Sequence, residues 1–255
     1  STNRIRLHFP TDRSIHIGDL RLALLTSLWA WSKKGIVVAT HDNTSALEDL
    51  AWLSVEPDEV VTANGPTAAS ELVDKLVEEN KAFACYCTPA ELREMPTASR
   101  EYIESTLYDG RCRSLSADDQ KALGKAGRKP SVRLRTTENP GEGLTKRLQD
   151  HLPKRFYDFV IRKPDGNVTA EFLAALHDEE SNTSHVLLHQ ADIHHLHQRI
   201  LVATSLGLKL PQFSLIAGVA QTGGEGKAWQ TVGQLRDAGF HPSAVFSALL
   251  SAGFS

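Results

Sequence analysis

The sequence predicts an α/β protein in which a mostly parallel sheet is interrupted by a small insert. Short apolar runs alternate with longer segments of helical period, which is the pattern of strands joined by helices. Between about Phe83 and Asn139 the composition changes to Lys, Arg, Ser and Pro, and all three cysteines lie there. The chain has 255 residues, of which 41% are hydrophobic and 23% are charged, so it can bury a full core.

The N-terminal segment predicts a strand, a helix and a second strand. Arg4–Phe9 alternates like a short strand, and Asp19–Lys33 repeats apolar residues three and four positions apart on one face. Gly35 is expected to end the helix, and Ile36–Thr40 is a β-branched run typical of a buried strand. The three elements together predict a β–α–β unit with parallel strands.

Later segments continue this alternation. The predicted elements are, in order, a helix at Ala68–Asn80, a strand at Phe156–Arg162, a strand at His185–His189, a helix at Asp192–Leu206 and a strand at Phe213–Gly218. The C-terminus is expected to be helical from Val232, with Pro242 opening the last helix. A sheet built in this way binds ligands at the carboxyl ends of its strands.

His16 and Gly18 follow the first predicted strand and lie just before the first predicted helix. The N-terminus of a helix offers free N–H groups and the positive end of the helix dipole, and both favour a bound phosphate. The two residues therefore indicate phosphate or nucleotide binding at this point. Alternatively, these residues preserve only the inherited geometry of a helix start and bind no ligand.

Cys85, Cys87, Tyr108 and Cys112 have the spacing of a metal site. Zn²⁺ can be held in a tetrahedron by ligands of these kinds: two thiols one residue apart, a third thiol further along, and a phenol four residues before that third thiol. Such an ion would be structural, because the protein fills all four coordination positions. Alternatively, Cys85 and Cys87 straddle a strand, and one buried thiol packs as a small apolar side chain.

The net charge of −3 favours no polyanion in general, so an RNA contact would need a local basic patch. Six residues form either such a patch or a solvated face: Lys121, Lys125, Arg128, Lys129, Arg133 and Arg135.

No apolar run approaches the ~20 residues that span a bilayer, and no signal-peptide profile is present. Three cysteines, an odd number, suit a reducing compartment, so we expect a cytoplasmic protein without membrane contact.

Histidines are concentrated in one further segment. They are His177, His185, His189, His194, His195 and His197. They could form a second metal site or an acid–base centre, in which Asp192 would orient one ring. Histidines scattered over a polar surface explain the same string.

Five segments of the chain occur in the order in which one enzyme family carries similar peptides. They are Arg6–Asp19 (RLHFPTDRSIHIGD, similar to RFAPSPTG-x-LHIGG), Ala82–Leu92 (AFACYCTPAEL, AYPCFCTPEEL), Leu107–Arg113 (LYDGRCR, YDGRCR), Asp158–Asp165 (DFVIRKPD, DFVLRRSD) and Val232–Ser255 (VGQLRDAGFHPSAVFSALLSAGFS, VEQYRDEGYLPEALLNYLALLGWS). Over nearly its whole length the chain thus resembles the glutamyl-tRNA synthetases. In size it is closest to the short glutamyl-Q tRNA(Asp) synthetases.

The resemblance implies a Rossmann-like class I synthetase nucleotide-binding fold with a small zinc-binding-type insert and a C-terminal helical segment. Residues 1–82 would form the first half of the catalytic fold, 83–140 the insert, 141–231 the second half and 232–255 the C-terminal helices, without an anticodon-binding domain. Enzymes of this family join ATP to an amino acid as an adenylate and then pass the acyl group to a tRNA. Their catalysis rests on positioning and on charge stabilisation at the α-phosphate.

For ATP, the resemblance implies that His16 touches the phosphates and that Gly18 lets the adenine pack against the backbone. The family's second ATP signature, a KLSKR-type loop, falls at about Thr222–Gly226, where glycines and a glutamate replace the lysines. Lys227 follows this loop and would be the cation left to reach the phosphates. A flexible, exposed connection is the alternative.

For the amino acid, the resemblance leaves one charged contact in place. Arg6 matches the arginine that reads the γ-carboxylate, whereas His41 stands where a glutamate holds the amino group. Leu188 replaces the arginine of HVIRGED, which pairs with a substrate carboxylate, and Ala170 replaces a substrate-facing tyrosine. Leucine offers none of a bidentate guanidinium–carboxylate pair, and imidazole cannot replace a carboxylate beside an ammonium group.

Three functional hypotheses follow. The first is a short synthetase that still activates an amino acid or a related acid. The second is an ATP-dependent adenylate-forming ligase that acts on a different acid or acceptor, through His41 and the His189–His197 segment. The third, which the loss of substrate and phosphate contacts favours, is a pseudo-synthetase or binding module whose partner is a tRNA, another macromolecule or a protein.

Overall fold

The chain divides into two compact units. One comprises Ser1–Ala63, Asp178–Asp192 and Pro211–Ser255, and the other comprises Asn64–His177 and Ile193–Leu210. We call them the parallel-sheet unit and the antiparallel-sheet unit. The computed structural model describes residues 2–7, 14–40, 44–62, 65–95, 108–136, 157–189, 192–216 and 231–251.

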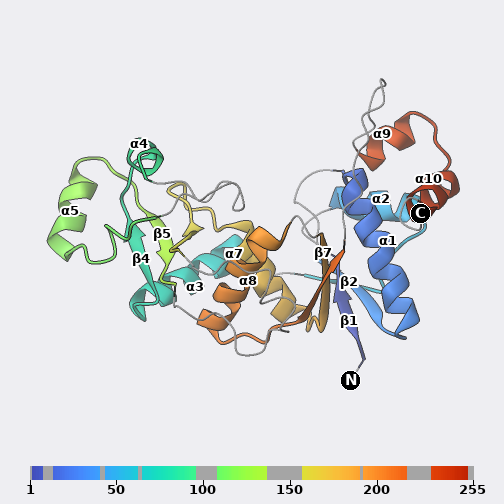
Figure 1. Cartoon of the computed structure of the whole chain (residues 1–255), viewed down its shortest axis with the longest axis horizontal. Coiled ribbons are helices and arrows are strands. Elements are labelled where there is room, and N and C mark those ends of the chain that lie inside the picture. Colours follow the sequence, from blue (N-terminus) through green and yellow to red (C-terminus); the bar gives the residue numbers. More distant parts are fainter. Residues whose placement is uncertain are drawn as a thin grey trace. The chain divides into compact units, whose positions relative to one another are not determined.

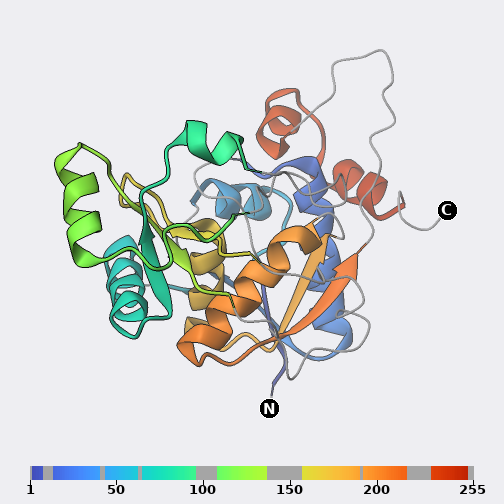
Figure 2. The ribbon, with the colours of Figure 1, turned by 60° about the vertical axis from the view of Figure 1, so that its left-hand side comes forward.

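The parallel-sheet unit contains a five-stranded sheet whose neighbouring strands all pair in parallel. In the order in which they pair, the strands are β3 (Glu59–Val61), β2 (Ile36–Thr40), β1 (Arg4–Arg6), β7 (His185–His189) and β8 (Gln212–Ile216). Ile5 pairs with Val37 on one side and with His185 on the other. The strand order therefore reverses between β1 and β7, which is where an open parallel sheet forms its ligand site. Figure 2 shows β7 and β8 side by side.

The described helices of this unit are α1 (Ile17–Ser32), α2 (Thr44–Trp52), α9 (Val232–Asp237) and α10 (Pro242–Ser251). Leu20 and Leu24 of α1 share one apolar core with Ile5 of β1 and with Leu50 of α2. Val245 of α10 joins the same core, so the C-terminal helices pack on α1 (Figure 1).

The end of α1 differs from the prediction. The helix stops at Ser32, and Lys34 rather than Gly35 takes the left-handed conformation, with φ of 50°. A Cβ at Gly35 would lie 2.6 Å from the backbone oxygen of Asn3. Glycine is therefore required at position 35 because the backbone before β1 passes close to it, and not because it caps the helix.

The antiparallel-sheet unit contains a second sheet in the order β4 (Ala82–Cys85), β5 (Ser131–Leu134), β6 (Val160–Arg162). Its described helices are α3 (Pro66–Glu78), α4 (Pro89–Arg93), α5 (Ala117–Lys125), α7 (Ala170–Glu180) and α8 (Ile193–Leu206), of which α7 ends in the other unit. Side chains alternate between the faces of β4 and β5. Ala82 and Val132 enter an apolar core with Phe172, whereas Phe83 and Cys85 enter a separate cluster.

The predicted fold class is confirmed: the chain is α/β, with a parallel five-stranded sheet, a cysteine-bearing insert and C-terminal helices. The predicted strands at Ile36–Thr40 and His185–His189 have the observed bounds, whereas the strand expected from Phe156 begins at Val160. The finer domain ranges remain predictions. Across the described ranges, no helix has the length and apolarity needed to cross a membrane.

Candidate nucleotide and metal sites

The carboxyl ends of β1 and β7 define the first candidate site. Arg6 ends β1, and His189 ends β7. His16, Gly18 and Asp19 lie at the start of α1, which is the helix that follows β1. We call these five residues the sheet-edge site. His41 and Lys227, which the sequence also assigns to substrate or ATP binding, lie outside the described residues.

His16 is the N-cap of α1. Its Nδ1 accepts a hydrogen bond from the backbone N–H of Gly18 at 3.3 Å, so a neutral His16 carries its proton on Nε2. At Gly18, an added Cβ would meet only Nδ1 of His16 within 4 Å, at an ordinary contact distance of 3.6 Å. Packing among the described residues therefore does not explain the glycine, which leaves the backbone of α1 open to close approach by a ligand.

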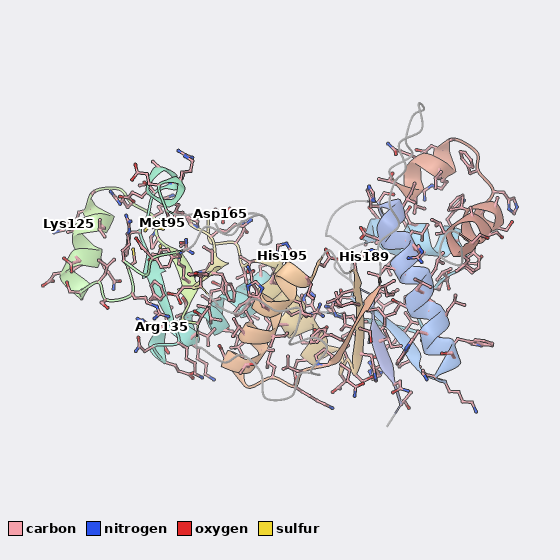
Figure 3. All side chains as sticks on the ribbon, in the orientation of Figure 1. Met95, Lys125, Arg135, Asp165, His189 and His195 are labelled. Atoms are coloured by element: carbon pink, nitrogen blue, oxygen red, sulfur yellow. The ribbon has the colours of Figure 1, made fainter. Side chains whose placement is uncertain are left out.

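Asp19 and His189 bring opposite charges to this edge when the imidazole is protonated. Oδ1 of Asp19 lies 3.7 Å from Nε2 of His189 (Figure 3 labels His189). In the family peptides LHIGG and HVIRGED, glycine stands at both positions. The carboxylate of Asp19 also lies in the first turn of α1, where it interacts favourably with the positive end of the helix dipole.

Arg6 is not exposed at the end of its strand. Its Nε donates to Oδ1 of Asp178 at 2.9 Å, and the two side chains are only 1% and 3% exposed. Leu188, which occupies the position of the family's carboxylate-binding arginine, is buried in β7. The arginine to which the sequence assigns substrate reading is therefore engaged by an internal carboxylate.

A buried aspartate ties this edge to α9. Oδ2 of Asp49 accepts from the Ser14 hydroxyl at 2.6 Å and from the Ile15 N–H at 2.8 Å, and its Oδ1 accepts from Arg236 at 3.4 Å. The N–H of Gly233 donates to the Ser14 hydroxyl at 2.8 Å. Sequence reasoning missed this set, which we call the Asp49 anchor, because its members are far apart in the chain and form no motif.

The second candidate site is the cysteine cluster, formed by Cys85, Cys87, Tyr108 and Cys112. The three sulfurs lie within 4.8 Å of one another, and Cys87 Sγ is 3.6 Å from Cys112 Sγ. The Tyr108 oxygen accepts from the Cys85 thiol at 3.6 Å and from the Cys112 N–H at 3.0 Å. A tetrahedral zinc ion with Zn–S bonds of about 2.3 Å places its sulfurs about 3.8 Å apart. The donor set and its spacing therefore fit such an ion.

Local structure holds the ligands of the cysteine cluster in place. Cys85 ends β4, and Thr88 caps α4 just after Cys87 with a full capping box. Phe83 and Met95 are buried in one apolar cluster with Cys85 and Cys112, whereas Cys87 is partly buried (Figure 3 labels Met95). Arg133 places its guanidinium carbon 4.0 Å from the centre of the Tyr108 ring. The prediction that Arg133 lies on a surface patch or solvated face is wrong, since the residue is only 7% exposed.

The protonation of the cluster differs from residue to residue. Burial raises the pKa of Cys85, but the charge of Arg133 and hydrogen bonds from Cys87, Tyr108 and Arg133 outweigh it and lower that pKa. Burial and the neighbouring sulfurs raise the pKa of Cys87. Burial and hydrogen bonds to Cys112 and Cys85 raise the pKa of Tyr108. A metal ion that binds here therefore displaces protons.

The predicted histidine cluster is divided between the two units and finds separate partners. His185 Nδ1 lies 2.8 Å from the Ser184 hydroxyl, and its ring lies 4.8 Å from that of Trp29. The His197 ring meets Phe159 edge-on at 6.2 Å. His195 is exposed near the start of α8 (Figure 3), and the side chain of His194 is not described. In the described part of the chain, the cysteines alone bring three potential ligands around one point.

Comparisons with known proteins point to one family. The sequence profile described as "tRNA synthetases class I (E and Q), catalytic domain" matches residues 9–255. The chain is 31% identical to a glutamate–tRNA ligase of Heliobacterium modesticaldum over 84% of its length and 49% of the relative's. It is 30% identical to that of Natranaerobius thermophilus over 100% of its length and 58% of the relative's. The chain thus spans about half the length of these relatives.

A solved structure agrees with these sequence relatives. It is a glutamate tRNA ligase from Elizabethkingia meningosepticum in complex with its amino acid, and it superimposes with a TM-score of 0.63 at 19% identity. The match covers 94% of this chain and 54% of that one. At this identity the likeness concerns the fold alone.

Proposed function

Because the chain belongs to the family of class I glutamyl- and glutaminyl-tRNA synthetase catalytic domains, we propose that it is a pseudo-synthetase, which keeps the family's scaffold as a binding module but does not activate glutamate. The observation that carries this proposal is the buried pair of Arg6 and Asp178. Arginine reads a substrate carboxylate through charge-assisted hydrogen bonds, and here an internal carboxylate already receives them.

The remaining contacts for glutamate support the same conclusion. Leu188 presents a buried apolar side chain where an arginine is expected, and Ala170 removes a phenol. His41, outside the described residues, offers an imidazole to an ammonium group. Each charged partner lost from a closed site typically costs ~2–4 kcal/mol, so the combined losses remove useful affinity for glutamate.

Charges at the phosphate end have also changed. Asp19 adds a carboxylate to the first turn of α1, where the resemblance places the phosphates of ATP. The segment that replaces the lysine-rich loop, Thr222–Gly226, offers glycines and a glutamate. Anion repulsion at Asp19, together with the missing cations, disfavours the build-up of charge that adenylate formation requires. We propose that any nucleotide bound here is held through His16 and Gly18. Lys227, which directly follows the loop segment in the sequence, is the cation left to reach the phosphates.

We further propose that the cysteine cluster binds a structural zinc ion through Cys85, Cys87, Tyr108 and Cys112. Zinc supplies no chemistry in such a closed site and instead links the strand β4 to the loop that carries Tyr108 and Cys112.

The relatives are named as ligases of tRNA. We therefore propose an RNA, with a protein as the alternative, as the partner of the module.

Pyrophosphate exchange tests the loss of activation directly. The purified chain, loaded with zinc, is assayed with ATP and glutamate and then with each other amino acid. We expect no exchange above background, because Arg6 is engaged by Asp178 and Leu188 cannot replace an arginine. Robust exchange with glutamate, or glutamylation of a tRNA, would overturn the proposal.

One observation favours the alternative, an ATP-dependent adenylate-forming ligase that acts on a different acid or acceptor. Packing among the described residues does not require Gly18, and His16 caps α1, which supports a nucleoside-binding end of the site. Nucleotide binding is measured as a rise in Tm with ATP, AMP and adenosine, since a ligand at 100 times its Kd adds about 2.7 kcal/mol. Exchange with an acid other than glutamate would establish this alternative.

A further inference from the structure

Arg133 is a buried cation beside the cysteine cluster. It is 7% exposed, and its guanidinium carbon lies 4.0 Å from the centre of the Tyr108 ring. Its Nη1 donates to the backbone oxygen of Asp158 at 2.9 Å. Its Nε is buried and has no hydrogen-bond partner among the described residues. A buried guanidinium with an unused donor is costly unless an anion faces it.

The carboxylate of Asp158 does not supply that anion. Its Oδ1 accepts from Arg113 at 2.7 Å and from the Thr136 N–H at 2.9 Å. Arg133 therefore hydrogen-bonds to Asp158 only through the backbone oxygen of that residue. Within the described ranges, no carboxylate lies at ion-pair distance from Arg133. Its positive charge therefore needs a negative partner of another kind.

The strand register points Arg133 at the cysteines. Arg133 of β5 pairs with Phe83 of β4, and Cys85 follows two residues later on the same face of the sheet. Long side chains reach such diagonal neighbours. The opposite face of the same two strands, with Ala82 and Val132, belongs to the apolar core. Only the face that carries Cys85 thus receives a charged residue from β5.

We infer that Arg133 is the counter-charge of the metal centre: it compensates the negative charge that a divalent ion held by three thiolates leaves in this buried cluster. The inference rests on the proposed metal site. Zn²⁺ with three thiolate ligands carries one negative charge in excess, and two of the three cysteines that would hold it, Cys85 and Cys112, are buried. Each charge alone is expensive to bury, and the two together stabilise each other. Arg133 is a positioning residue and does not touch the ion.

Zinc affinity of the full chain tests this role. Wild type, Arg133→Met, Arg133→Lys and Arg135→Met are titrated against a chromophoric chelator. Arg135 is the matched control, because it stacks on Phe83 from the same face, at 4.9 Å, without covering Tyr108. We expect Arg133→Met to weaken zinc binding about 10- to 100-fold, which is the usual loss when an outer-shell partner is removed. Arg133→Lys and Arg135→Met are expected to stay within roughly threefold of wild type.

Two further readouts separate a charge role from mere packing. In the cobalt-loaded Arg133→Met variant, the thiolate-to-cobalt absorption is retained, because the three sulfurs still bind. Zinc raises the Tm of this variant less than it raises that of wild type, while the metal-free Tm is unchanged or higher. Equal zinc affinity in Arg133→Met and wild type would overturn the inference. So would a loss of Tm of the same size with and without zinc.

The variants also distinguish this inference from the metal site on which it rests. If wild type binds neither zinc nor cobalt, both proposals fail together. If wild type binds zinc and Arg133→Met binds it equally well, only the role of Arg133 fails. Should the methionine variant not fold, Arg133→Lys still decides, because a tenfold loss of zinc affinity in that folded variant contradicts a role based on charge.

Discussion

The cysteine cluster and the sheet-edge site place their buried arginines against different partners. The cluster brings three sulfurs and a phenol together beside Phe83 and Met95, and Arg133 lies buried next to them. In the sheet-edge site His16 caps α1, Asp19 lies close to His189, and Arg6 pairs with Asp178. The buried cation of the cluster faces potential metal ligands, whereas the buried cation of the sheet-edge site faces an internal carboxylate.

The largest effect should come from breaking the cluster. Replacing Cys112 by serine removes one thiolate from the proposed zinc site, and structural zinc ions contribute apparent free energies of ~10 kcal/mol in small domains. We expect loss of bound zinc and a fall in Tm greater than that of any other substitution proposed for this chain. Metal content and calorimetry measure both. Met95→Leu, a volume-conserving change in the same cluster, is the control and should cost less than ~1.5 kcal/mol. An equal effect of the two changes would contradict a metal role.

A second large effect should come from Asp178→Ala. This change removes the buried carboxylate that pairs with Arg6, and breaking a buried ion pair typically costs about 3–5 kcal/mol. Urea denaturation measures the change in the free energy of unfolding. Glu59→Ala, which breaks the exposed pair with Arg4, should change stability far less. If the two variants were equally stable, the pairing of Arg6 with Asp178 would contribute nothing measurable, and the contrast between the two sites would disappear.

A smaller effect is expected at the Asp49 anchor. Asp49→Asn keeps the size of the side chain but removes the charge that accepts from Ser14, Ile15 and Arg236. The loss should be about 1–3 kcal/mol, because Asp49 is 1% exposed. Urea denaturation measures it, with the exposed Asp237→Asn on α9 as control. A change no larger than that of the control would mean that the sheet edge does not depend on this anchor.

The smallest effect concerns the phosphate end. Asp19→Gly restores the family's glycine and removes an anion from the first turn of α1, an interaction of about 0.3–1 kcal/mol. We expect ATP to bind about 2- to 5-fold more tightly to this variant than to wild type. The binding of adenosine, which carries no phosphate, should be unchanged. Calorimetric titration with both ligands measures the difference, and a parallel gain for adenosine would show that Asp19 acts by steric hindrance.

Much of the fold could be predicted from the sequence because local patterns decide it. The β-branched run Ile36–Thr40 and the segment His185–His189 are strands with the predicted bounds. Helix ends were less accurate, since the approach of Asn3 to Gly35 depends on a strand pairing that periodicity does not reveal. The grouping of Cys85, Cys87 and Cys112 was predicted from spacing, because the three residues lie close together in the chain.

The charged contacts of the interior could not be predicted in the same way. Arg6 was assigned to a substrate, and nothing in its neighbourhood pointed to Asp178. The sequence places Arg133 and Arg135 on a basic patch or a solvated face, yet they alternate with Val132 and Leu134 and so lie on the side of Phe83 and Cys85. That alternation was a usable signal. No signal of this kind exists for Asp49, whose partners are brought together only by the folded sheet.

The Asp49 anchor has a consequence for the order in which the protein is made. Ser14 and Gly233 are separated by 219 positions, and Asp49 and Arg236 by 187. A ribosome must therefore synthesise most of the polypeptide before Ser14 and Asp49 can acquire their last hydrogen bonds. Contacts between such distant positions form slowly, so the early strands lack this support until α9 has been made.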